Sequence, residues 1–166
     1  MKGLKGVQHV SSTVRDLEET LAWYRDVLGI EPFMRMDAAG EELSAGLGVP
    51  GAELDVAFLD VGGTWVELIE YRRPLDAARE PSLRRCDHGA AHICLEVEDI
   101  HAAHRHLVEH GVRCHAGPNY VGEGAGILEG AWFLYFDGPE GLMYELHQMP
   151  PGFDPEAAVA AARDAG

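Results

Sequence analysis

The feature that most constrains the fold of this chain is a nine-residue pattern that occurs twice. HVSSTVRDL begins at His9 and HICLEVEDI begins at His92, 83 positions later, and both fit H-[VI]-x-x-x-V-x-D-[LI]. Similarity within a chain at a fixed offset indicates that a structural unit is duplicated. The 166-residue chain therefore predicts two similar modules.

Each copy of the pattern opens the same series of elements. A strand leads to an aspartate, Asp16 or Asp99, which suits the N-cap of the helix that follows. Each helix ends at a glycine, Gly29 or Gly111, the residue type that most often closes a helix. Strand-like segments complete each half, so the predicted fold class is α+β with two tandem βαβββ modules.

The modules divide the chain into four expected parts. We expect one domain over residues 1–150, with module one at 5–71, a linker at 72–89, module two at 90–148, and a helical tail at 151–166. Asp154 and Pro155 are typical of the first turn of that tail helix.

Two long segments interrupt the repeat, and we expect both to be loops. Residues 37–53 are acidic and rich in glycine, and residues 117–130 contain the run GEGAG. Loops of this length inside a compact domain are usually functional.

Composition excludes several classes of function. The net charge of −15 at pH 7 repels phosphate backbones, which argues against nucleic-acid binding. No apolar run is long enough to span a bilayer, and the first residues do not resemble a secretory signal. The three cysteines, Cys86, Cys94 and Cys114, show no C-x-x-C spacing. We therefore expect a cytoplasmic protein with reduced thiols that acts on a small molecule.

One segment departs from the acidic average. Residues 71–85 contain five arginines, at positions 72, 73, 79, 84 and 85. The simpler interpretation is a solvated linker with scattered salt bridges. The alternative is that some of these arginines bind an anionic group of a substrate.

In the first strand of each module, side chains alternate between two faces, and a histidine lies on the face that the apolar side chains do not occupy. Val10 and Val14 share one face of the segment 9–14, and His9 lies on the other. In the second copy, His92 alternates in the same way with Ile93. The pattern predicts a sheet that packs on helices with one face and lines a polar space with the other.

The last strand of each module carries a glutamate among apolar residues. Glu67 alternates with Val66 and Leu68, and Glu145 occupies the corresponding place in the second module. A carboxylate on a partly buried face is costly without a partner, and the two histidines can supply one. Glu70 falls on the face of Val66 and Leu68, so we prefer Glu67.

Together, these two imidazoles and two carboxylates can hold a divalent metal. The predicted ligands are His9, Glu67, His92 and Glu145. Nitrogen and oxygen donors in equal number suit Zn, Ni, Co, Mn or Fe(II), and leave positions open to water or substrate. Candidate substrate-binding residues on the same strands are Ser11, Trp65 and Cys94. A hydrogen-bonded network without a metal is the alternative.

These segments resemble the vicinal oxygen chelate superfamily. That superfamily includes glyoxalase I, methylmalonyl-CoA epimerase, extradiol dioxygenases, and the fosfomycin and bleomycin resistance proteins. The resemblance covers about residues 5–148 and is carried by QHVSSTVRDLEETLAWYRDVLGI, FLDVGGTWVELIEY, GAAHICLEVEDI and YFDGPEGLMYELHQ. It implies a cup-shaped mixed sheet around a metal, with helices on the outer face, and maps the four predicted ligands onto the family's ligand positions.

Retention of all four ligand positions favours the glyoxalase and epimerase branch of this family. The implied reaction is a proton shift α to a carbonyl, on a substrate whose vicinal oxygens chelate the metal. Glu145 is the expected catalytic base, and Glu67 is its counterpart for reprotonation. We also expect a homodimer, with the metal site formed either within one chain or across the dimer.

Two other functions fit the same residues. The first is a non-haem Fe(II) extradiol-type dioxygenase that uses His9, His92 and Glu145 as a facial triad. The second is a non-catalytic small-molecule binding or resistance protein, with Trp65, Trp132 and Tyr135 in its pocket.

Overall fold

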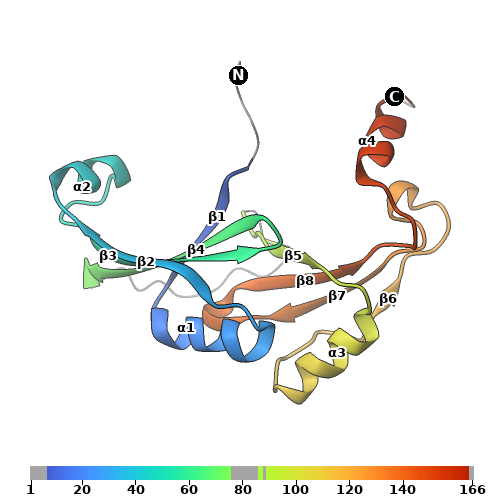
Figure 1. The fold of residues 1–166 in the computed structure, drawn as a ribbon, viewed down its shortest axis with the longest axis horizontal. Helices are drawn as coiled ribbons and strands as arrows, with labels where there is room; N and C mark the ends of the chain where they lie inside the picture. Colours follow the sequence, from blue (N-terminus) through green and yellow to red (C-terminus); the bar gives the residue numbers. More distant parts are fainter. Residues whose placement is uncertain (1–6, 76–85, 88, 165–166) are drawn as a thin grey trace. The chain divides into compact units, whose positions relative to one another are not determined.

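The computed structural model describes residues 7–75, 86–87 and 89–164, and for residues 160–164 it describes the backbone only. The chain forms two compact units, Met1–Ser82 and Leu83–Gly166. Each unit contains one copy of the sequence repeat. Each forms its own four-stranded sheet, and the two sheets have the same strand arrangement (Figure 1). The predicted α+β class with two tandem modules is confirmed.

In the residues that the structure describes, the first unit consists of four strands, two helices and a π-helical turn. In chain order they are β1 His9–Val14, α1 Leu17–Trp23, the π-helical turn Tyr24–Leu28, β2 Pro32–Ala39, α2 Glu41–Leu47, β3 Glu53–Val61 and β4 Thr64–Arg73. The strand order in the sheet is β1-β4-β3-β2. β1 runs parallel to β4, and the other neighbours are antiparallel.

The second unit repeats this sheet. Its elements are β5 Ile93–Glu96, α3 Ile100–Glu109, β6 Asn119–Tyr120, a 3-10 turn Gly126–Leu128, β7 Trp132–Asp137, a 3-10 turn Pro139–Gly141, β8 Met143–Gln148 and α4 Pro155–Asp164. The strand order is β5-β8-β7-β6, and β5 is parallel to β8. Asp154 accepts two backbone hydrogen bonds at the start of α4, as predicted.

The caps of the two repeated helices are those that the sequence predicts. The Asp16 carboxylate accepts a backbone N–H of α1 at 2.8 Å, and the Asp99 carboxylate accepts two N–H groups of α3 at 3.0 and 2.9 Å. Gly29 and Gly111 follow the helices with left-handed φ angles of 69° and 73°. A side chain is strained in that conformation, which explains glycine at both positions.

A second cap at each helix comes from the last strand of its module. The Glu70 carboxylate of β4 accepts the N–H of Leu17 at 2.7 Å, and the Gln148 side chain of β8 accepts the N–H of Ile100 at 2.8 Å. Each of these bonds satisfies an N–H that has no partner within its helix. Because Glu70 reaches the helix, it lies on the helix-covered face of the sheet, as predicted.

One face of each sheet forms the hydrophobic core with its helix. In module one the fully buried side chains on this face and on the helix are Leu17, Tyr24, Ala57, Leu59, Val66 and Leu68. In module two they are Ile100, Leu107, Leu134, Phe136, Tyr144 and Leu146. The side chains at the alternate strand positions, which include Glu67 and Glu145, lie on the opposite face of each sheet.

The expected loop at 37–53 is wrong in part. Its first residues belong to β2, and its centre is the short helix α2. Glu41 and Glu42 occupy the first turn of α2, where the helix dipole favours negative charge. The segment 117–130 likewise contains the short strand β6 and a 3-10 turn.

The strand β4 continues to Arg73, so the first two residues of the expected linker 72–89 belong to this strand. Arg72 lies 3.3 Å from the Asp55 carboxylate, and Arg73 lies 3.5 Å from that of Glu53. These two arginines therefore fit the salt-bridge interpretation of the arginine-rich segment. Its other three arginines, at 79, 84 and 85, lie outside the described residues.

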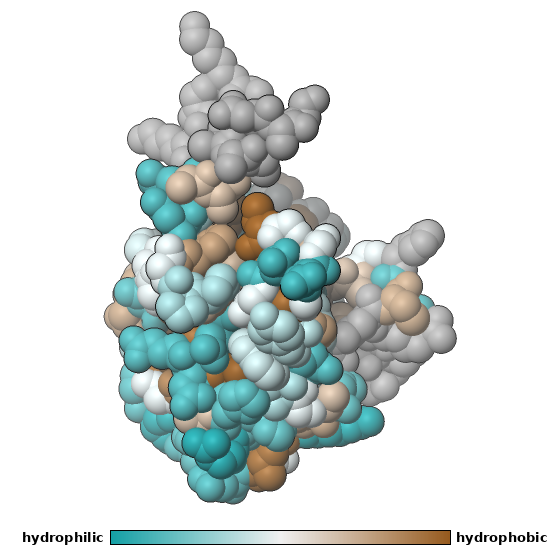
Figure 2. All heavy atoms as spheres, turned by 90° about the vertical axis from the view of Figure 1, so that its right-hand side faces the viewer, coloured by the Kyte–Doolittle hydropathy of each residue, from teal (hydrophilic) through white to brown (hydrophobic). Residues whose placement is uncertain are grey.

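Across the described ranges, no helix is both long and apolar enough to cross a membrane. The face drawn in Figure 2 is mostly hydrophilic, and its hydrophobic residues form separate spots. Such a surface agrees with a chain of which 25% is charged.

The Glu70 cap gives a prediction about stability. Glu70→Ala leaves the N–H of Leu17 without its acceptor at a partly buried helix start, so we expect the free energy of unfolding to fall by about 1–3 kcal/mol in urea titrations. Glu70→Gln keeps an acceptor, as Gln148 does in module two, and should retain most of the stability. Equal losses in the two variants would contradict the capping role.

Candidate functional site

Strand pairing in module one brings the predicted histidine and glutamate together. In the parallel register of β1 and β4, His9 is opposite Trp65 and Ser11 is opposite Glu67. His9 Nε2 lies 3.4 Å from Glu67 Oε2. The Glu67 side chain is 17% exposed and that of His9 is 36% exposed, so the carboxylate is held in the sheet and the imidazole remains accessible.

Module two repeats this arrangement. His92 immediately precedes β5, and its Nε2 lies 3.0 Å from Glu145 Oε2 on β8. Cys94 is opposite Glu145 in the parallel register, in the place that Ser11 has in module one. The Glu145 side chain is 12% exposed and that of His92 is 41% exposed.

An aromatic ring on the third strand contacts each histidine edge-on. His9 meets Phe58 with ring centroids 6.0 Å apart, and His92 meets Tyr135 at 5.4 Å. In both modules the aromatic residue is directly opposite the glutamate in the antiparallel register. The histidine, the glutamate and the aromatic residue therefore share the face of the sheet that is opposite the helix.

The spacing of each His–Glu pair fits two neighbouring ligands of one metal ion. Two ligand atoms about 2.1 Å from an ion are about 3.0 Å apart at an angle of 90° and about 3.4 Å apart at 109°. The observed N–O distances are 3.4 Å in module one and 3.0 Å in module two. One imidazole and one carboxylate per module are also donors that divalent transition metals accept.

The structure presents the four predicted ligands as two pairs. Within the part of the chain that the structure describes, no group of three or more histidine, cysteine or carboxylate side chains is placed to hold a metal ion. Each pair offers two ligands, whereas metal sites in proteins commonly use three or four from the protein. A site with all four residues therefore stays a prediction.

The three candidate substrate-binding residues lie next to the pairs. Ser11 and Trp65 are the strand neighbours of Glu67 and His9, and Cys94 is the neighbour of Glu145. Burial, and then the charge of Glu145 and the hydrogen bond to it, raise the pKa of the Cys94 thiol to about 11. The Cys94 thiol therefore stays protonated at neutral pH and can donate to Glu145.

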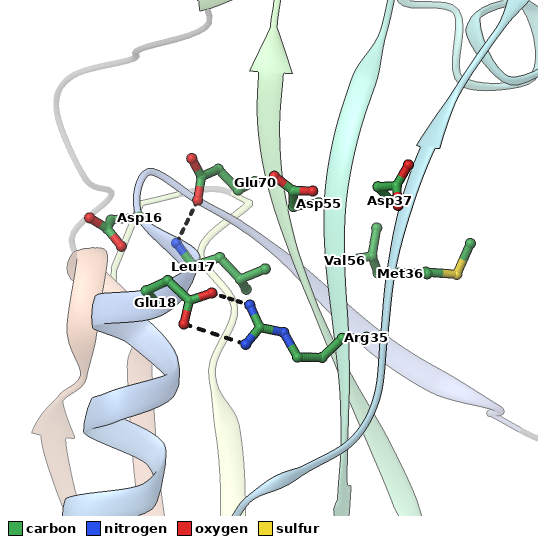
Figure 3. A pocket seen from close by; sticks show the side chains of 9 residues that line it. All are labelled: Asp16, Leu17, Glu18, Arg35, Met36, Asp37, Asp55, Val56 and Glu70. Carbon is green, nitrogen blue, oxygen red and sulfur yellow. Dashed lines mark hydrogen bonds and ion pairs between the residues drawn. The ribbon is translucent and has the colours of Figure 1, made fainter.

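A hollow of about 680 Å³ opens on the other face of module one, at the start of α1 (Figure 3). It is lined by Asp16, Leu17, Glu18, Arg35, Met36, Asp37, Asp55, Val56 and Glu70. The single arginine in this lining forms an ion pair with Glu18. None of the predicted site residues lines the hollow, so it is separate from the His9–Glu67 pair.

Trp132 does not belong to the face on which the His92–Glu145 pair lies. It is opposite Gln148 in the register of β7 and β8, and its ring contacts that of His101 on α3 at 4.9 Å. The pocket proposed with Trp132 is therefore wrong for this residue, whereas Tyr135 does lie beside Glu145.

Sequence reasoning missed Phe33. The register of β2 and β3 shifts between Pro32 and Met34, which leaves Phe33 as an extra residue in β2. Its ring contacts that of Trp65 at 5.1 Å and remains 51% exposed. The irregularity depends on the partner strand, so no local sequence pattern marks it.

Comparison with known proteins matches both modules to a single family. The family described as the Glyoxalase/Bleomycin resistance protein/Dioxygenase superfamily matches residues 6–146. A 2-epi-5-epi-valiolone epimerase from Actinomyces sp is 33% identical over 155 residues, which are 90% of this chain and 82% of the relative. An ethylmalonyl-CoA/methylmalonyl-CoA epimerase from Cereibacter sphaeroides is 31% identical, covering 86% of this chain and 97% of the relative.

Solved structures share the fold. A glyoxalase family protein from Bacillus cereus aligns with a TM-score of 0.72 at 20% identity, over 90% of this chain and 98% of its own. A fosfomycin resistance protein from Listeria monocytogenes, solved with Mn(II) and sulfate, aligns with a TM-score of 0.55 at 16% identity, over 90% and 97% of the two chains. The likeness to these two structures concerns the fold.

The contact between Cys94 and Glu145 can be tested by alkylation. With a pKa of about 11, about one Cys94 in a thousand is a thiolate at pH 8, so iodoacetamide should label this residue slowly in EDTA-treated protein. Glu145→Gln removes the negative charge and should speed labelling several-fold, as site-resolved mass spectrometry can measure. Glu109→Gln, on α3, is the control. Equal rates in both variants would contradict the contact.

Proposed function

The chain belongs to the glyoxalase/bleomycin resistance protein/dioxygenase superfamily, and we propose that within it the protein is a divalent-metal-dependent epimerase. The proposed reaction moves a proton α to a carbonyl, on a substrate with two neighbouring oxygens. The observation that carries the proposal is the repeated His–Glu pair, with N–O distances of 3.4 and 3.0 Å that suit adjacent metal ligands.

The proposed ligands are His9 and Glu67 from module one, with His92 and Glu145 from module two. Two ligands from one module are too few for a stable site, so the proposal requires both modules, of one chain or of two copies in a homodimer. When bound, the ion supplies a Lewis acid that stabilises negative charge on the substrate oxygens. A metal-bound structure of one family member supports this choice of cofactor.

Two glutamates carry out the two proton transfers of the proposed reaction. In the proposed mechanism, Glu145 takes the proton from the α-carbon, and Glu67 returns one from the other side. Each glutamate comes from a different module, which suits a reaction that inverts the configuration of a carbon atom. The Cys94 thiol donates to Glu145 and holds its carboxylate in one orientation.

The two relatives described above are named epimerases, and their names supply two candidate substrates. 2-Epi-5-epi-valiolone is an uncharged ring ketone with hydroxyl groups. Methylmalonyl-CoA is an anionic thioester. Both have an acidic hydrogen next to a carbonyl, so both fit the proposed chemistry.

Metal content tests the ligand assignment. Protein stripped with EDTA and reloaded with Zn, Ni, Co, Mn or Fe(II) should hold one ion per site, measured by mass spectrometry of the metal. His9→Ala and His92→Ala should each abolish most of that binding, because each removes one of few ligands. Glu70→Gln, three residues from Glu67 but on the helix-covered face, should bind as the wild type does. Unchanged metal content in the histidine variants would overturn the assignment.

Exchange of the α-proton tests the reaction. In D₂O, the metal-loaded protein should incorporate deuterium into a candidate substrate, and Glu145→Gln should slow this by about 10²-fold or more, because general-base catalysis contributes that much. Mass spectrometry of the recovered substrate gives the rate. Bound iron with catechol-dependent oxygen uptake and no exchange would contradict the proposal and favour the dioxygenase alternative.

A further inference from the structure

Three aromatic rings lie together on the Glu67 face of module one. Phe33 contacts Trp65 at 5.1 Å and Phe58 at 6.3 Å, and Phe58 contacts Trp65 at 6.2 Å. Phe58 is opposite Glu67 in the register of β3 and β4, and Trp65 is opposite His9 in that of β1 and β4. These rings, which we name the aromatic cluster, are therefore immediate neighbours of the His9–Glu67 pair.

A β-bulge places the outermost ring of the aromatic cluster. Pro32 pairs with Leu59 and Met34 pairs with Phe58, so two steps along β2 match one step along β3. The extra residue is Phe33, whose ring reaches Trp65 yet stays 51% exposed. Bulges frequently redirect a side chain beside an active site. Here the bulge holds a large apolar surface, still open to solvent, next to the proposed ligands.

The strand β2 extends this apolar surface beyond the aromatic cluster. Met34 is opposite Phe58 in the register of β2 and β3 and is 41% exposed. Methionine adapts its shape to varied ligands and packs well against aromatic rings. The Glu67 face thus combines the His9–Glu67 pair with an exposed apolar area.

Free positive charge is missing from this surface among the described residues. Arg25, Arg35, Arg72 and Arg73 each form an ion pair with a carboxylate of module one. Arg15, the remaining described cation of this module, also has an interaction partner. Phosphate groups in proteins are usually bound by arginine, lysine or backbone N–H groups. With a net charge of −15, the chain further disfavours a polyanionic ligand.

We propose that the substrate is an uncharged, hydroxylated ring ketone, and that Phe33 and Trp65 bind the apolar face of its ring. The C–H groups of such a ring carry slight positive charge and pack on the negative faces of aromatic rings. Its carbonyl and a neighbouring hydroxyl group provide the two adjacent oxygens that the proposed reaction needs. This inference rests on the proposed epimerase function and selects one of the two candidate substrates.

Substrate preference is the first test. Deuterium exchange should proceed with a kcat/KM at least about 10²-fold higher for 2-epi-5-epi-valiolone than for methylmalonyl-CoA, because a chain with a net charge of −15 repels the phosphates of the thioester. A preference for methylmalonyl-CoA would overturn the ring-ketone inference and leave the epimerase proposal intact. It would also favour the alternative in which arginines of the linker bind an anionic group.

The aromatic contact is tested by a matched pair of variants. Phe33→Ala should raise KM for the ring ketone about tenfold and leave kcat within about twofold, because it removes contact area without touching the acid–base groups. Tyr120→Ala is the control. Tyr120 is also exposed on an edge strand and contacts a tryptophan, Trp132, at 5.1 Å, but on the helix side of module two.

Binding separates failure of the inference from failure of the proposed function. The ring ketone should change the tryptophan fluorescence of metal-loaded protein, and Phe33→Ala should weaken the apparent Kd about tenfold while Tyr120→Ala leaves it unchanged. Equal KM and Kd in wild type and Phe33→Ala would overturn the aromatic contact even if exchange proceeds. Binding that depends on Phe33 but gives no exchange would support the contact and overturn the epimerase function.

Discussion

The parallel pairing between the first and last strands of each module is the constraint on which the rest of the structure depends. Parallel neighbours cannot be joined by a tight turn, so the helix and two strands between them must form the connection. The same pairing fixes Ser11 opposite Glu67 and Cys94 opposite Glu145, and so brings each histidine within 3.4 or 3.0 Å of its glutamate. A slip of one residue would turn each glutamate into the hydrophobic core.

The last strand of each module carries functional or capping side chains on both faces of its sheet. Glu67 and Glu70 are three positions apart, so they point to opposite sides of β4. Glu67 meets His9, and Glu70 accepts the first N–H of α1, which anchors the helix to the strand that carries the proposed ligand. In module two, Glu145 contacts His92, and Gln148 accepts the first N–H of α3. These hydrogen bonds tie each helix to the strand that carries the glutamate of its His–Glu pair.

Much of this was predictable from local pattern, and the rest depends on partners distant in sequence. The duplicated motif, the caps at Asp16 and Asp99, and the face of Glu67 follow from periodicity and residue type. The bulge at Phe33 depends on the pairing of β2 with β3 and leaves no local signature. Trp132 is three positions from Tyr135 on β7, so strand alternation alone already places the two rings on opposite faces of the sheet. The four-ligand metal site is still a prediction, supported by the spacing within each pair.

The two modules are alike in fold but differ beside their glutamates, and this difference bears on the proposed roles. Burial, the charge of Glu145 and the hydrogen bond to it raise the pKa of the Cys94 thiol to about 11, so the thiol keeps its proton at neutral pH and can donate to Glu145. The hydroxyl of Ser11, opposite Glu67, can rotate and either donate or accept. The neighbour of Glu145 is therefore a hydrogen-bond donor, whereas the neighbour of Glu67 can serve as donor or acceptor. That asymmetry supports Glu145 as the base and Glu67 as the group that returns the proton.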